Sequence, residues 1–233
     1  MITISFLIQF VPVITGFIFL KIILLNYKQS KIILIYSLIG IITELLSKFT
    51  NSILTINSMY FIHFYTLIEF ILLSYIFYKG IAFENLKKYL VAVSVLYFVV
   101  WIMLKIFIED FNSFDNYSSA LSSILLAAVS LVMLSKLMVN NEIKPLKNPT
   151  FWFLSSVFVY HFLNIIVFLF YNLQEYEMMW TFHSAVNITS QILMTIYFIS
   201  LNRLIADENK GIRDLIRESD EIRNRIKYKL ALI

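Results

Sequence analysis

Long runs of apolar residues, broken by short polar connections, follow one another along most of the chain. A helix needs about 20 mainly apolar residues to cross the hydrocarbon core of a bilayer. Seven runs reach or approach that length: residues 3–25, 32–49, 58–78, 89–108, 118–139, 150–171 and 179–202. The pattern therefore predicts an all-α, polytopic membrane protein with a seven-transmembrane-helix bundle over residues 1–202.

After residue 202 the chain becomes rich in Arg, Lys, Asp and Glu. Apolar residues recur there at intervals of three, four or seven, the spacing of one face of an amphipathic helix. They are Ile212, Leu215, Ile222, Ile226, Leu230 and Ile233. Residues 203–233 are predicted to form a helical tail, with Gly211 at its joint with the last span. Such a helix could lie on the membrane, fold under its own bundle, or dock on a protein partner or a second copy.

The connections alternate in charge. The first, third and fifth are basic, with Lys28, Lys31, Lys79, Lys87, Lys88, Lys144 and Lys147. The fourth and sixth are acidic, with Glu109, Asp110, Asp115, Glu175 and Glu177. Because basic connections stay preferentially in the cytoplasm, we expect the N-terminus outside and the C-terminus, with the tail, in the cytoplasm.

The composition agrees with a membrane location. Hydrophobic residues make up 60% of the chain and charged residues 15%, where a soluble domain has roughly 25% charged residues. The net charge of +4 lies mainly in the connections and the tail, so it indicates membrane orientation and lipid contact rather than a nucleic-acid partner. The absence of Cys excludes disulfides and thiolate chemistry, and no nucleotide-binding or hydrolase motif is present, so we expect no cofactor.

Two carboxylates fall inside predicted spans, Glu44 in the second and Glu69 near the middle of the third. A charge at mid-bilayer costs at least about 2.5 kcal/mol, so such residues normally face the bundle interior or a cavity. Tyr65 lies one helical turn before Glu69. We expect both carboxyl groups to be protonated or hydrogen-bonded.

The seventh span carries a polar stripe, because His183, Asn187, Gln191 and Thr195 recur every four residues and share one helical face. A single polar cavity near the outside would explain these groups, and we predict that it binds a ligand. Its predicted residues are Glu44, Tyr65, Glu69, His161, Asn164, His183, Asn187 and Gln191. The alternative is that they only form contacts between helices.

All three histidines, His63, His161 and His183, fall inside predicted spans. Zinc hydrolases often use three protein ligands and leave one position open, so a metal site built from these histidines is an alternative. No two of them share a helix at four-residue spacing, however, so no local metal motif supports it.

Three stretches carry a resemblance: Phe64-Tyr-Thr-Leu-Ile-Glu-Phe, Phe151-Trp-Phe-Leu-Ser-Ser leading to Tyr160, and the start of the last span near Trp180, with His183 and Asn187. In these the chain resembles a loose group of small, uncharacterised bacterial seven-helix membrane proteins. Members of that group resemble receptors without an output domain and are often encoded beside sensor histidine kinases. The resemblance implies a bacterial cytoplasmic (inner) membrane location and a signalling partner.

Three functions remain open on the sequence. The favoured one is a receptor-like sensor, in which an outward cavity responds to a small ligand or to protons and the tail relays the change to a partner. The second is a metal-dependent intramembrane lipid hydrolase. The third is an accessory membrane platform of a larger defence or envelope complex. We favour a protein that is not an enzyme.

Overall fold

The computed structural model describes residues 2–19, 28–50, 59–80, 84–139, 144–170 and 176–230. Within these ranges the regular elements are helices and none is a strand, which confirms the all-α prediction. They are α1 (Ile2–Ile18), α3 (Lys28–Phe49), α4 (Met59–Gly80), α5 (Glu84–Phe107), α6 (Tyr117–Val139), the short 3₁₀ turn η2 (Pro145–Lys147), α7 (Pro149–Phe170) and α8 (Tyr176–Leu230).

Six of the described helices are long and apolar enough to cross a bilayer, so the chain is a multi-pass integral membrane protein. They are α3 to α7 and the first part of α8. The first helix, α1, has 17 residues and is shorter than the predicted first span. That span, residues 3–25, runs into residues 20–27, which lie outside the described part of the chain.

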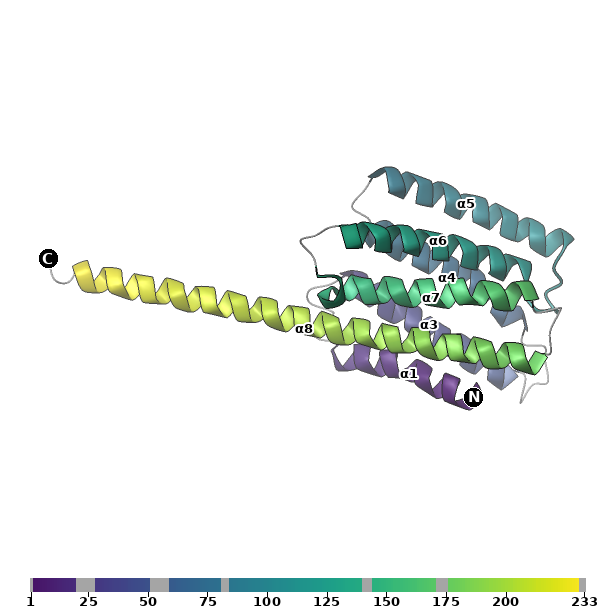
Figure 1. Ribbon diagram of the computed structural model, residues 1–233, viewed down its shortest axis with the longest axis horizontal. Helices are drawn as coiled ribbons and strands as arrows, with labels where there is room; N and C mark the ends of the chain where they lie inside the picture. The colour runs from purple at the N-terminus through teal and green to yellow at the C-terminus, as the bar shows by residue number, and fades with distance from the viewer. Residues whose placement is uncertain are drawn as a thin grey trace.

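The bundle helices lie side by side (Figure 1). Their contacts close into a ring, because α1, α3, α4, α5, α6, α7 and α8 each contact the next and α8 returns to α1. Large apolar side chains cover its outer surface; on α5, for example, Leu96, Ile106 and Phe107 are 63%, 67% and 75% exposed. Serines, histidines and carboxylates are buried inside. This inverted distribution is expected of a bundle whose surroundings are lipid.

A tightly packed apolar core fills the half of the bundle nearer the tail. Phe77, Phe153, Phe198 and Leu201 are almost fully buried there. Gly16 of α1 allows close packing, because a Cβ at this position would lie 2.6 Å from Leu34 Cδ1 and 3.3 Å from the Phe198 ring. Small residues of this kind let transmembrane helices approach each other closely.

The last helix, α8, is continuous over 55 residues and projects far beyond the bundle (Figure 1). The predicted joint at Gly211 is therefore wrong: glycine in a helix interior costs only about 1 kcal/mol, and the residues around it are good helix formers. A tail folded under the bundle is also wrong for the described side chains, since Ile212 and Leu215 are 56% and 67% exposed. The side chains of residues 222, 226 and 230, and residue 233, lie outside the described part.

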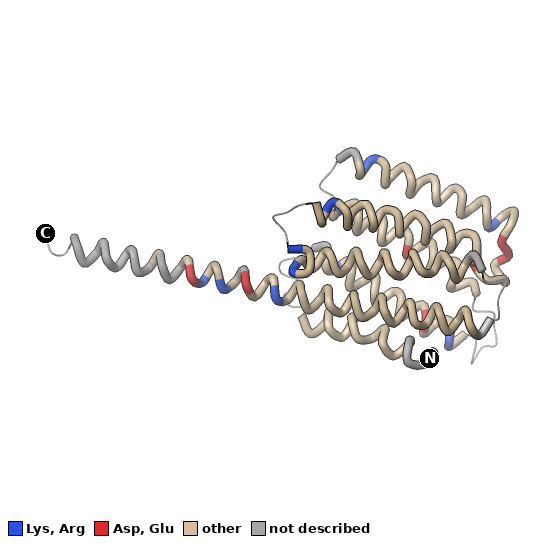
Figure 2. The backbone as a smooth tube through the Cα atoms, viewed as in Figure 1, with Lys and Arg blue, Asp and Glu red and all other residues tan. Residues whose placement is uncertain are grey.

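Charged residues are unevenly distributed along the bundle (Figure 2). Lys and Arg gather mainly at the end from which α8 emerges, and Asp and Glu mainly at the opposite end. The two ends therefore differ in charge in the way the connections predict.

Candidate functional site

A cavity of about 340 Å³ lies inside the ring, in the half of the bundle opposite to the tail. Its wall comes from α1, α3, α4, α6, α7, α8 and the connection before α6. Six of the eight residues predicted to bind a ligand line it: Glu44, Tyr65, Glu69, His183, Asn187 and Gln191. The cavity has the size of a small-molecule site.

The wall contributed by α8 is the predicted polar stripe. His183, Asn187 and Gln191 face the cavity, and the Gln191 amide donates to Asn187 Oδ1 at 3.1 Å. Thr195, one turn further, is not part of the lining; its hydroxyl donates back to the Gln191 carbonyl at 2.8 Å. The stripe thus leaves the cavity after Gln191, and α8 enters the apolar core.

Glu69 projects from the middle of α4 and is held by two phenols. Tyr36 Oη and Tyr65 Oη both donate to Glu69 Oε1, at 2.9 Å and 3.1 Å. The sequence singled out Tyr65 by its four-residue spacing from Glu69. Tyr36 was missed, because its contact depends on how α3 packs against α4.

Glu44 also lines the cavity, but a cation already neutralises it. Lys48 Nζ, one turn later on α3, lies 2.9 Å from Glu44 Oε1. The same ammonium lies 3.4 Å from the centroid of the Phe6 ring. The Glu44 carboxylate is therefore part of a local ion pair rather than a free charge.

His161 and Asn164 of α7 lie behind the cavity wall rather than in it. His161 is almost fully buried, and its Nδ1 lies 3.3 Å from Ser123 Oγ of α6. Asn164 Oδ1 lies 2.8 Å from His183 Nδ1. Both residues therefore support side chains that face the cavity.

The alternative metal site built from three histidines is wrong. Within the described ranges, the ligand atoms of His63, His161 and His183 do not form a close group. His63 instead lies in a separate polar cluster, whereas His183 borders the cavity and His161 packs against α6. Each histidine has a different partner: His63 the Ser113 carbonyl, His161 the Ser123 hydroxyl and His183 the Asn164 amide oxygen.

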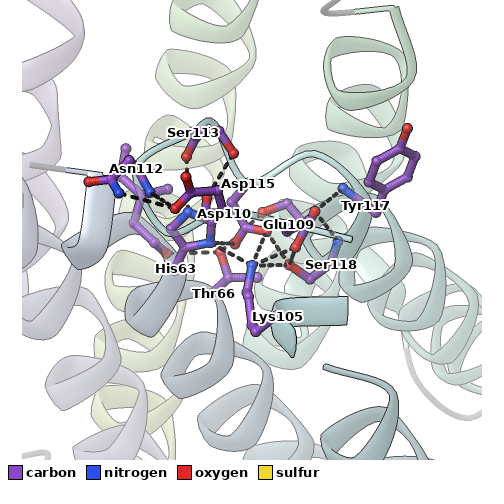
Figure 3. Close-up of polar contacts among 12 residues, drawn as sticks. His63, Thr66, Lys105, Glu109, Asp110, Asn112, Ser113, Asp115, Tyr117 and Ser118 are labelled. Atoms are coloured by element: carbon purple, nitrogen blue, oxygen red, sulfur yellow. Dashed lines mark hydrogen bonds and ion pairs between the residues drawn. The ribbon is translucent and has the colours of Figure 1, made fainter. Parts of the chain in front are cut away.

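That polar cluster is a buried ion network, which we define as His63, Lys105, Glu109, Asp115 and Ser118 (Figure 3). It joins α4, α5, the connection 108–116 and the start of α6. The Lys105 ammonium lies 2.6 Å from Glu109 Oε2, 2.9 Å from Asp115 Oδ1 and 2.7 Å from Ser118 Oγ, and it also contacts His63 Nδ1. The side chains of the four ionisable members are at most 3% exposed.

The His63 ring connects the network to the connection before α6. Its Nε2 lies 3.0 Å from the Ser113 carbonyl, which can only accept, so Nε2 carries a proton. Its Nδ1 lies beside the Lys105 ammonium and 3.7 Å from Asp115 Oδ2. The two carboxylates of the network thus share the Lys105 cation.

Glu109 also caps the N-terminus of α6. Its Oε1 accepts the backbone N–H groups of Tyr117 and Ser118, at 2.5 Å and 3.1 Å, where the positive end of the helix dipole favours an anion. Burial alone would raise the pKa of Glu109, but hydrogen bonds from Lys105 and Ser118 outweigh this effect and hold the pKa below its ordinary value. Glu109 is therefore an anion that orders the start of α6.

His63, Glu109 and Asp115 have donor atoms close enough together to hold a metal ion. The Lys105 ammonium, however, is in hydrogen-bond contact with all three side chains. A metal would have to displace a buried cation that already binds all three side chains. The geometry thus favours an ion network without metal.

Sequence reasoning missed this network. The available signal was Lys105 near the end of an apolar run, with Glu109 one turn later and Asp115 beyond it.

No known protein family, curated protein or solved structure matches the chain. The function is therefore inferred from the cavity, the network and α8.

Proposed function

We propose that the chain is a receptor-like sensory membrane protein in which a small ligand occupies the cavity and α8 carries the response to the tail. The observation that carries this proposal is the continuity of α8. The same helix forms a cavity wall at His183–Gln191 and, after the buried Ile205, an exposed rod over the described side chains of residues 206–215. A change at the wall can thus reach the tail without crossing a hinge.

The distance along this helix is considerable. From Gln191 to Ile212 the helix rises by roughly 30 Å at 1.5 Å per residue. Between these points Tyr197, Phe198 and Leu201 are buried in the apolar core, and Tyr197 Oη donates to Ser30 Oγ of α3 at 2.7 Å. A small rotation of α8 at the cavity must repack these side chains, and close-packed cores respond in discrete steps.

The tail offers a surface for a protein partner. Ile212 and Leu215 are exposed on a helix otherwise rich in charged residues. The sequence resemblance adds a membrane-anchored histidine kinase as a candidate for this partner. In an accessory platform, by contrast, the cavity and the tail would not be coupled.

The proposal requires the cavity half to face outward and the tail to be cytoplasmic. We expect a cysteine at exposed Tyr117 to react with a membrane-impermeant maleimide in intact cells, and one at exposed Leu146 to react only after lysis. The chain has no Cys of its own, so each variant reports one position. The reverse pattern would contradict the orientation.

Hydrogen exchange tests the proposal without a known ligand. Gly40 lines the cavity. Among the described residues, a Cβ added there would come within 4 Å of Tyr65 Oη alone, at 3.4 Å, so Gly40→Leu partly fills the space. In nanodiscs, we expect this variant to change the amide exchange rates of residues 203–215 about twofold to thirtyfold, the range of typical coupling energies.

Ile35→Phe is the matched control, because Ile35 lies on the same helix and is 48% exposed on the outer surface. It adds volume without entering the cavity and should leave exchange in the tail unchanged. Altered exchange in Gly40→Leu at residues 179–194, with none at 203–215, would reject the sensor in favour of the platform.

A further inference from the structure

The hydrogen bonds that the described side chains donate to the Glu69 carboxylate all reach one of its two oxygens. Both phenol donors, Tyr36 and Tyr65, bind Oε1. No side chain of the described ranges donates a hydrogen bond to Oε2, although Glu69 lines the cavity. One oxygen therefore remains available to an occupant of the cavity.

The other ionisable groups of the described lining do not balance this charge. Glu44 and Lys48 neutralise each other at 2.9 Å. His183 is engaged with Asn164 through Nδ1, at 2.8 Å. Among the described lining residues, Glu69 is thus the carboxyl group without a paired cation, and in a low-dielectric space a cation placed beside it is held strongly.

Aromatic rings surround the same space. Tyr36, Tyr65 and Tyr160 line the part near Glu69, and Phe114, Phe168 and Trp180 line the part near the ends of the helices. Phe114 and Trp180 form a T-shaped pair with centroids 6.0 Å apart. Faces of aromatic rings bind ammonium groups and also cover apolar ligand bodies.

We infer that the cavity takes a small organic cation, an amine whose ammonium group pairs with Glu69 Oε2 and whose apolar body lies against the aromatic wall. This inference rests on the proposed function, since it names the ligand class of the same cavity. A volume of about 340 Å³ is far larger than a bare metal cation needs and suits a small amine. Asn187 and Gln191 provide amide groups for a second polar contact.

Three probes of nearly equal size and different charge test this inference: phenethylammonium, phenethyl alcohol and phenylacetate. Each is added to the purified full chain in detergent at one concentration and ionic strength, and the Tm is recorded. A ligand that binds only the folded state raises the Tm. We expect phenethylammonium alone to raise it.

Glu69→Gln should weaken phenethylammonium binding about tenfold or more, as expected for loss of a charged hydrogen-bond partner. Glu69→Asp keeps the carboxyl group and is the control for a folding defect in Glu69→Gln. It should retain part of the binding. Asp110→Asn removes an exposed carboxylate outside the cavity and should leave binding unchanged.

An equal or larger Tm rise with the alcohol or with phenylacetate would overturn the amine class, and so would no rise with phenethylammonium. Binding that survives fully in a folded Glu69→Gln variant would overturn the role of this carboxylate. The exchange experiment with Gly40→Leu uses no ligand, so failure of the amine class and failure of the sensor function are distinguishable.

Discussion

Replacing Lys105 with Met is expected to destabilise the protein by about 3–5 kcal/mol, the usual cost of removing one partner from a buried ion pair. The Glu109 and Asp115 carboxylates would lose their shared cation, and the side chains of both are almost fully buried. The connection 108–116 and the start of α6 should loosen first, because Glu109 caps that helix. Thermal unfolding of the purified protein, followed by circular dichroism, measures the effect.

Two further variants make this prediction specific. Lys88→Met changes an exposed lysine of the same helix and should alter stability by less than about 0.5 kcal/mol. Lys105→Met combined with Glu109→Gln and Asp115→Asn removes all three charges and should recover most of the loss. If Lys105→Met were as stable as the wild type, or if the triple variant recovered none of the lost stability, the buried ion network would be contradicted.

Glu69→Lys should be far more damaging than Glu69→Gln. Glutamine keeps an oxygen that can accept from Tyr36 and Tyr65, so we expect a loss of about 1 kcal/mol. Lysine would place a cation beside two hydroxyl donors in the middle of a span, at a further cost of at least about 2.5 kcal/mol. Folded yield and Tm in detergent report the difference.

Equal yields and Tm values for the two Glu69 variants would mean that this side chain is not held inside the bundle. Ile68→Lys on the same helix is a useful comparison, because Ile68 is 42% exposed on the outer surface. Its lysine would face lipid rather than the phenols. Glu69→Gln should exceed both lysine variants in stability.

Most of the correct predictions came from the length of the apolar runs and the spacing of polar residues within them. Apolar runs of about 20 residues have few structures open to them in a bilayer, so the helices could be predicted from length alone. Four-residue spacing likewise placed His183, Asn187 and Gln191 on one face of α8, and the structure puts that face on the cavity. That a ligand binds there stays a prediction.

Contacts between helices could not be read in this way. Lys105 sits at the end of an apolar run, and its partner His63 lies 42 residues earlier in the sequence. Tyr36 and Glu69 likewise meet across 33 residues. Such pairs depend on which helices are neighbours and how they are rotated, and no local pattern encodes either property.

The most direct test of coupling between cavity and tail is the distance between spin labels on two introduced cysteines. Val139, the exposed last residue of α6, provides the reference position, and Ile212 provides the position in the tail. Each pair is measured by double electron–electron resonance in nanodiscs. An insertion of three glycines after Asn202 serves as the control, because it interrupts the rigid helix.

Filling the cavity with Gly40→Leu is predicted to shift the distance between positions 139 and 212 by about 2 Å or more, the scale of helix movements in switching proteins. The glycine insertion should broaden the distance distribution and abolish the response to Gly40→Leu. An identical distribution in wild type and in folded Gly40→Leu would contradict transmission along α8.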